Sequence, residues 1–109
     1  MKATTGRQKA VLDALRTLIP LAPMADFEPI VAATRARHLR TLAPRDAAFL
    51  ITVAHIRHRH TEYDALLEEG YDTESARHFV LDDINATLRD WGSPRQLSPD
   101  DPTESDQAL

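Results

Sequence analysis

The residues best suited to chemistry lie in one short stretch of the chain and at one position beyond it. Residues 57–64 read Arg-His-Arg-His-Thr-Glu-Tyr-Asp, and a further arginine follows at position 77. Arginine pairs with carboxylate and phosphate groups through parallel N–H donors, and partly protonated histidine strengthens phosphate binding. The stretch predicts a site for an anionic group, formed by Arg57, His58, Thr61, Tyr63, Asp64 and Arg77.

Arg77 occupies a position where a hydrophobic residue is expected. A helix is predicted from about Glu74 to Trp91, and a rotation of roughly 100° per residue places Arg77 among apolar side chains. Those side chains are Val80, Leu81, Ile84, Leu88 and Trp91. Because a buried, unpaired charge is costly, we expect Asp64 to pair with Arg77 and the Tyr63 hydroxyl to assist.

Two interpretations of this cluster remain open. It is either a structural knot that fixes how the last helix docks, or a site that binds or acts on an anion. In the helix expected over about residues 44–60, helical spacing places Arg57 and His60 on the apolar face and directs His55 and Arg59 toward solvent. Positive charge is favoured at a helix C-terminus, which explains part of this enrichment without any function.

Motifs for metal, cofactor or catalytic chemistry are absent from the sequence. His55 and His58 are three residues apart, but the chain has no HExxH pair and no cysteine, and zinc requires three or four ligands. GxxxxGK[ST], GxGxxG and GxSxG are also missing. We therefore expect no metal and no cofactor, assign no catalytic residue, and favour a binding protein over an enzyme.

Charge is distributed unevenly along the chain. Residues 1–61 hold ten Lys or Arg and four Asp or Glu, whereas residues 62–109 hold three and thirteen. The basic half predicts a surface for an anionic partner, with the acidic end limiting non-specific binding. Further phosphate contacts are predicted at Arg35, Arg37, Arg40 and Arg59. The alternative is that the two halves neutralise each other within one fold.

Helical periodicity runs through the chain, and sustained strand-like alternation is missing. The spacing predicts helices over about residues 8–19, 26–40, 44–60, 61–69 and 74–91, with Asp26 capping the second. The expected fold is all-α: a compact bundle of four to five helices over residues 1–92 and a disordered acidic tail over residues 93–109. Without an apolar run of about 18 residues or a signal peptide, we expect a cytoplasmic protein with no membrane partner.

Part of the sequence resembles a known family. The pattern RHxxTxYDxLLxxG is matched from Arg57 to Gly70, and it is followed by Ala76-Arg77 and a helix closed by Trp91. This pattern is similar to that of the bacterial proteins grouped as domain of unknown function 2293, and it covers about half of the chain. The resemblance implies a shared helical domain and brings no activity, substrate or partner.

Three functions follow from these observations. The first, which we favour, is binding of nucleic acid or another polyanion. The second is a protein-interaction or regulatory adaptor that uses an exposed part of an apolar stripe on residues 8–19 or 44–60. The third is an enzyme in which the cluster of residues 57–77 lines a pocket for an anionic substrate.

Overall fold

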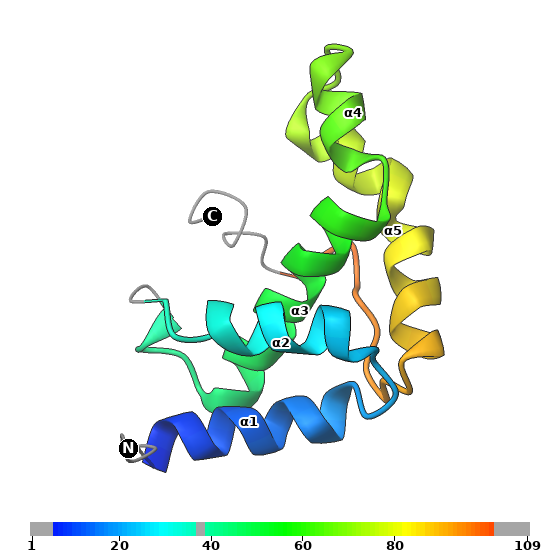
Figure 1. The fold of residues 1–109 in the computed structure, drawn as a ribbon. Helices are drawn as coiled ribbons and strands as arrows, with labels where there is room; N and C mark the ends of the chain where they lie inside the picture. The colour runs from blue at the N-terminus through cyan, green and yellow to red at the C-terminus, as the bar shows by residue number, and fades with distance from the viewer. Residues whose placement is uncertain (1–5, 37–38, 102–109) are drawn as a thin grey trace.

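The structure, a computed structural model, describes residues 6–36 and 39–101. Within these ranges the chain forms five helices and no strand: α1 (Gly6–Leu18), α2 (Met24–Ala33), α3 (Pro44–His60), α4 (Tyr63–Glu68) and α5 (Thr73–Asp90). Figure 1 shows α3 running through the middle of the molecule, with α1 below it, α4 at the top and α5 to the right. The predicted all-α bundle is confirmed. None of the described helices is long and apolar enough to cross a membrane.

The core is built around α3. Its buried residues surround the helix instead of forming one stripe, which is the pattern of a helix covered on several sides. Pro44 suits the start of α3 because the first turn needs no backbone N–H donor there. The buried residues that cover α3 and its neighbours recur at helical spacing: Val11, Leu15 and Leu18 in α1, and Ala76, Val80, Ile84 and Leu88 in α5. Each fully buried leucine or isoleucine contributes roughly 1.5–3 kcal/mol relative to exposure.

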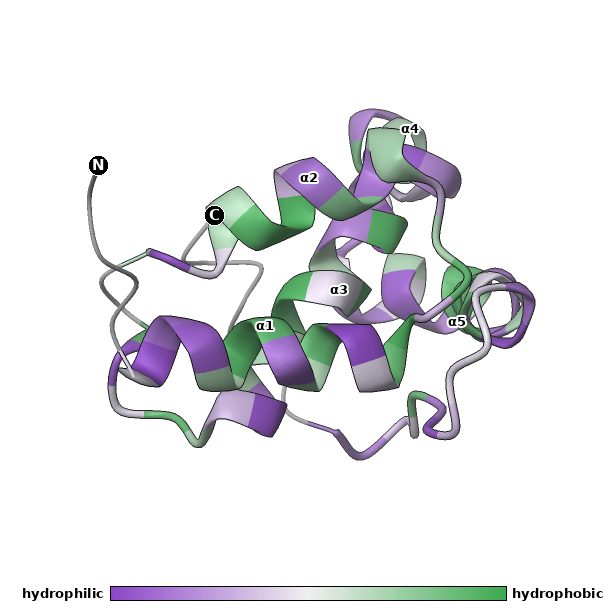
Figure 2. Ribbon diagram, turned by 60° about the horizontal axis from the view of Figure 1, so that its bottom comes forward, coloured by the Kyte–Doolittle hydropathy of each residue, from purple (hydrophilic) through white to green (hydrophobic). Residues whose placement is uncertain are grey.

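Hydropathy follows this arrangement. Figure 2 shows hydrophobic and hydrophilic segments alternating along α1, as expected for a helix that is covered on one side only. The apolar stripes of α1 and α3 are therefore used within the fold. Among residues 6–36 and 39–101, the exposed large hydrophobic residues lie elsewhere, at Leu21, Met24, Tyr71 and Phe79.

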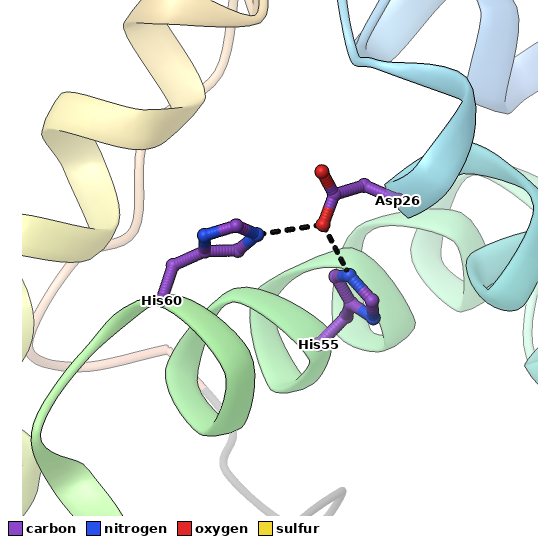
Figure 3. Close-up of side chains that lie close together, drawn as sticks. All are labelled: Asp26, His55 and His60. Carbon is purple, nitrogen blue, oxygen red and sulfur yellow. Dashed lines mark hydrogen bonds and ion pairs between the residues drawn. The ribbon is translucent and has the colours of Figure 1, made fainter.

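The bounds of α2 differ from the prediction at both ends. The helix begins at Met24, so Asp26 lies in its first turn and is not its cap, and its side chain points toward α3 (Figure 3). The helix ends at Ala33 instead of near residue 40, and the Thr34 hydroxyl donates to the Val31 carbonyl oxygen at 2.6 Å. The early end has a packing reason, because the turn brings Leu39 back into the core, where it is 1% exposed.

Two glycines end the last two helices in the left-handed conformation. Gly70 has φ of 106° and Gly92 has φ of 83°, and each closes its helix with the paired backbone hydrogen bonds of a Schellman motif. Space also limits Gly92, because an added Cβ would lie 3.1 Å from the Pro20 Cγ. The Leu21 N–H donates to the Trp91 carbonyl at 2.9 Å, so the end of α5 is fixed against the turn between α1 and α2.

The segment after α5 packs on the bundle, so the prediction of a disordered tail is wrong for residues 93–101. Leu97 is 9% exposed, and Asn85 of α5 holds its backbone from both sides. The Leu97 N–H donates to Asn85 Oδ1 at 2.7 Å, and the Asn85 amide donates to the Leu97 carbonyl at 3.1 Å. Residues 102–109, the rest of the predicted tail, lie outside the described residues.

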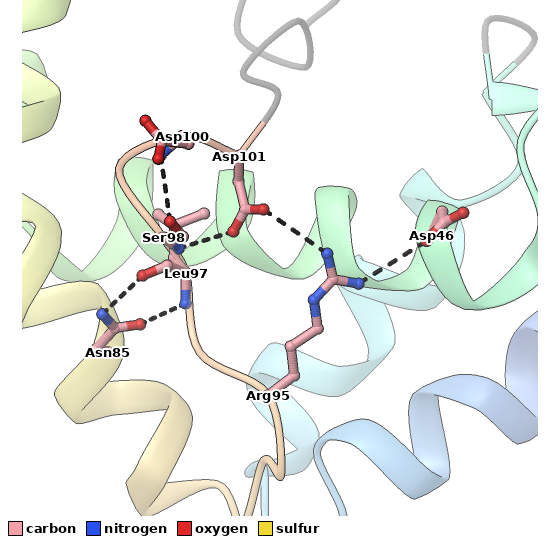
Figure 4. A network of polar contacts seen from close by, with 7 residues as sticks. All are labelled: Asp46, Asn85, Arg95, Leu97, Ser98, Asp100 and Asp101. Carbon is pink, nitrogen blue, oxygen red and sulfur yellow. Dashed lines mark hydrogen bonds and ion pairs between the residues drawn. The ribbon is translucent and has the colours of Figure 1, made fainter.

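Arg95 attaches the same segment to α3. Its guanidinium stacks on the Phe49 ring, with Cζ 3.7 Å from the ring centroid. Figure 4 shows this guanidinium between Asp46 and Asp101, at 3.8 and 4.0 Å respectively. Residues 93–101 are thus held on the bundle by the burial of Leu97, by the stacking of Arg95 on Phe49 and by the two hydrogen bonds of Asn85.

Removing the leucine tests this attachment. We expect Leu97→Ala to lower the free energy of unfolding by about 2 kcal/mol, the low end for a buried leucine, because Leu97 lies at the edge of the core. Urea denaturation measures the change. Leu21→Ala, at a residue that is 69% exposed, is the control and should change stability by less than about 0.5 kcal/mol. Equal effects of the two variants would contradict the packing described.

The start of α5 predicts a pH effect. Asp72 Oδ1 accepts from the Ser75 N–H at 2.8 Å, and this bond holds the pKa of the Asp72 carboxyl below its usual value of 3.8. The charged cap therefore stabilises the fold above pH 3.8, and this stabilisation is lost as the pH falls through the lower folded-state pKa. Asn caps a helix without a charge, so wild type should exceed Asp72→Asn in stability near neutrality, and the difference should disappear in acid.

Denaturant unfolding at a series of pH values measures this difference. Asp82→Asn removes one exposed charge from the middle of α5 and is the matched control. A difference between wild type and Asp72→Asn that is the same in acid and near neutrality would refute the role of the charged cap.

Candidate anion-binding site

The arginine in the core is Arg57, and Arg77 lies less deeply than predicted. Arg57, in the last turn of α3, is 1% exposed, whereas Arg77 in α5 is only partly buried. The Arg57 Cζ lies 5.5 Å from the centroid of the Tyr63 ring. The face of a tyrosine attracts a cation, so this ring provides part of the favourable surroundings that a buried guanidinium requires.

The predicted cluster forms a row that runs from the core to the surface. Tyr63 is 1% exposed, and the His58 ring meets it edge to face at a centroid distance of 5.4 Å. His58 Nδ1 lies 2.8 Å from Asp64 Oδ1, and these two side chains are 33% and 60% exposed. Asp64 therefore pairs with His58, whereas the sequence predicted Arg77 as its partner. The inner half of the row is sealed, and the outer half is open.

Thr61 explains why Asp64 faces α3. It caps the C-terminus of α3, where its hydroxyl donates to the Arg57 carbonyl and accepts from the Tyr63 N–H at 3.2 Å. These contacts turn the chain sharply and start α4 beside the last turn of α3. The turn brings Asp64 next to His58.

Arg77 lines a cleft of about 700 Å³, and Arg57, although only 1% exposed, is also among the residues that border it. The first turns of α5 form one side of it, with His78 close to Arg77, and residues 97–101 form the other. Glu74 and Asp101 also line the cleft, so its charge is mixed. Tyr63, His58 and Asp64 do not line it. The cleft therefore unites only two of the six residues predicted from the sequence.

A second group of arginines surrounds a smaller pocket of about 270 Å³, where α1 meets the end of α2. Arg7, Arg35 and Arg40 line it together with Gln8 and Thr34, and no acidic residue is among the lining residues in the described ranges. Two of these arginines, at positions 35 and 40, were predicted phosphate contacts. Arg7 was not predicted as a phosphate contact, because it lies 28 positions before Arg35 and no local spacing connects the two.

The three arginines differ in how they are held. Arg7 donates to the carbonyl oxygens of Leu42 and Leu39, at 2.8 and 2.6 Å, which fixes its guanidinium without neutralising it. Arg35 and Arg40 are exposed. Within the described ranges, none of the three forms an ion pair with a carboxylate. The pocket is thus bordered by positive charge that is not compensated by ion pairs.

The other two predicted phosphate contacts are Arg37 and Arg59. Arg37 lies outside the described residues. Arg59 is exposed in the last turn of α3, and a helix of 17 residues is about 25 Å long, so Arg59 lies at the opposite end of α3 from the arginine pocket.

Sequence reasoning missed a third polar cluster, which joins α2 to α3. His55 Nε2 lies 2.8 Å and His60 Nε2 lies 2.6 Å from Oδ1 of Asp26 (Figure 3). His55 was predicted to face solvent, but its side chain is only 10% exposed, whereas the side chain of His60 is 38% exposed. Asp26 is 29 positions from His55, so no local pattern could have revealed the contact.

The charge state of this cluster is set by competing effects. Burial raises the pKa of the Asp26 carboxyl, but the hydrogen bonds from His60 and His55, together with the electrostatic contribution of the two rings, outweigh burial. The pKa of Asp26 therefore lies below its usual value. Asp26 is held as a carboxylate that faces two imidazole rings.

Comparison with known proteins gives a family and nothing more specific. The sequence model of the family described as "Uncharacterized conserved protein (DUF2293)" matches residues 14–92. No curated protein matches the chain, and no solved structure matches it. The match includes the row from Arg57 to Asp64 and the cluster at Asp26, whereas Arg7 precedes it.

The two halves of the row should respond differently to substitution. We expect Tyr63→Ala to cost about 3–5 kcal/mol of unfolding free energy, because it empties a buried aromatic site. Asp64→Ala should cost less than about 1 kcal/mol, since the pair it breaks is exposed. Chemical denaturation measures both, and a double-mutant cycle with His58→Ala isolates the pair. If Asp64→Ala costs as much as Tyr63→Ala, the row is structural along its whole length.

Proposed function

We propose that this chain, a member of the DUF2293 family, is a small helical module that binds a polyanionic partner such as nucleic acid. The observation that carries the proposal is the pocket bordered by Arg7, Arg35 and Arg40. A cysteine-free chain suits a reducing compartment, and we propose the cytoplasm as its location.

The electrostatics of the pocket favour phosphate groups. Three guanidinium groups, beside which residues 6–36 and 39–101 place no carboxylate in the pocket lining, form a positive potential that attracts anions and raises their association rate. Arg7 is held in place by two carbonyl groups before any ligand arrives, so little of its conformational freedom remains to be lost. Arg35 and Arg40 project from the surface beside it, where they can contact successive phosphates of an extended chain.

The cleft beside Arg57 is the weaker candidate for the same partner. Glu74 and Asp101 line it and oppose the charge of Arg57 and Arg77. Asp101 is partly engaged by Arg95 and by the Ser98 N–H, but its negative charge remains in the cleft. The binding roles of Arg57, His58, Thr61, Tyr63, Asp64 and Arg77 stay predictions.

An enzymatic role has less support. It requires a pocket in which the polar groups of residues 57–77 converge, and Tyr63 and Asp64 do not line the cleft that holds Arg57.

A protein partner is the second candidate. Tyr71 and Phe79, 43% and 60% exposed, stack edge to face at 5.5 Å beside a hollow of about 190 Å³, and aromatic residues are enriched at interface hot spots. If the chain binds a protein through this surface, Phe79→Ser should abolish binding, and removal of charge at the arginine pocket should leave binding unchanged.

Fluorescence anisotropy with a labelled oligonucleotide tests the polyanion proposal. We expect Arg35→Ala and Arg40→Ala each to weaken binding by roughly three- to tenfold at low salt, and to reduce the slope of log affinity against log salt by about one. Arg89→Ala, at an exposed arginine of α5, is the matched control and should leave the affinity close to that of wild type. Absence of binding at low salt, affinity that does not change with salt, or an equal loss in Arg89→Ala would each overturn the proposal.

A further inference from the structure

Three potential metal ligands from two different helices converge at the junction of α2 and α3. Oδ1 of Asp26 lies 2.8 Å from His55 Nε2 and 2.6 Å from His60 Nε2. One ligand atom from each of the three residues lies within 4.8 Å of the other two. Figure 3 shows both imidazole rings directed at the carboxylate from α3, with Asp26 approaching from α2.

We infer that Asp26, His55 and His60 form a binding site for a divalent transition-metal ion of the zinc class. Two imidazole nitrogens and one carboxylate oxygen suit zinc and its neighbours in the first transition row, whereas calcium and magnesium prefer oxygen ligands only. A set of three protein ligands leaves a coordination position for water or an external ligand, as in catalytic zinc sites. The site goes beyond polyanion binding and does not depend on it.

The distances fit an ion after a small adjustment. Zinc bonds of about 2.0–2.1 Å place ligand atoms of a tetrahedral site about 3.4 Å apart. The two observed nitrogen–oxygen distances, 2.8 and 2.6 Å, are those of hydrogen bonds, so the carboxylate must move back by somewhat less than 1 Å. Both hydrogen bonds use Oδ1, and rotation of the Asp26 side chain can also present Oδ2 to an ion.

The surroundings shield two of the ligands and expose the third. The side chains of His55 and Asp26 are 10% and 15% exposed, and that of His60 is 38% exposed. Trp91, which is 6% exposed, forms an apolar wall: its ring meets His60 edge to face at 5.6 Å and lies 6.5 Å from His55. An ion can therefore reach the site past the more exposed His60 side chain, and the indole, which lies against both imidazole rings, limits the water around them.

The proposal departs from the sequence-based expectation that no metal binds. That expectation rested on the three-residue spacing of His55 and His58 and on the absence of an HExxH pair. His55 and His60 are five apart, and they converge because His60 is the last residue of α3 and Asp26 lies between the two rings. The third ligand, Asp26, comes from another helix and lies 29 positions before His55, so no short sequence motif connects it with the two histidines.

Zinc titration of the metal-free full-length protein tests the site. We expect one Zn²⁺ per chain by calorimetry, with a matching change in the fluorescence of Trp91, the single tryptophan. Asp26→Asn and His60→Gln should each weaken zinc binding at least about tenfold, since each removes one of three ligands. His38→Gln, His58→Gln and His78→Gln are the matched controls, because they remove the other three histidines, and each should bind zinc like wild type.

Circular dichroism of each variant confirms folding before affinities are compared. If Asp26→Asn does not fold, His60→Gln and the visible spectrum of Co²⁺ bound to wild type decide the question. An intense cobalt spectrum of a four- or five-coordinate ion, lost in His60→Gln, supports the site. Failure of wild type to bind zinc, unchanged affinity in His60→Gln, or loss of binding in a control variant instead would overturn the inference.

Discussion

The burial of α3 on nearly every side is the constraint on which the rest of the structure depends. Nine of its residues are buried, from Ala47 to Arg57, so helices and the segment after α5 must cover it from several directions. Apolar area removed from water is the dominant favourable term in folding, and a helix that is apolar all round gains it only when it is surrounded. Each neighbour of α3 is therefore positioned by that helix, including Arg95 stacked on Phe49.

The same constraint divides the polar end of α3. In the sequence, residues 55–60 look like one basic patch of alternating histidine and arginine. In the fold, His55 and His60 meet Asp26 of α2, His58 meets Asp64 of α4, and Arg57 passes under Tyr63. Because successive residues of a helix point in different directions, neighbours on different sides receive different members of the run. The patch becomes separate polar contacts, each with its own partner.

Helical periodicity predicted the structure correctly where a feature depends on one helix alone. The bounds of α3 at Pro44 and His60 were predicted correctly, because Pro44 marks the first turn and Thr61 marks the start of the next element. Periodicity failed where two distant segments decide together. The depth of Arg77, the partner of Asp64 and the packing of Leu97 each depend on how one element lies against another, and tertiary contacts of that kind leave no trace in local spacing.

Helix α2 links the arginine pocket with the histidine cluster. Asp26 lies in its first turn, while Val31 near its end, with Thr34 and Arg35 just beyond, lines the arginine pocket. Ten helical residues span about 15 Å, so one short helix separates the two sites. The carboxylate that joins α2 to two histidines of α3 therefore also helps to set where Arg35 stands relative to Arg7.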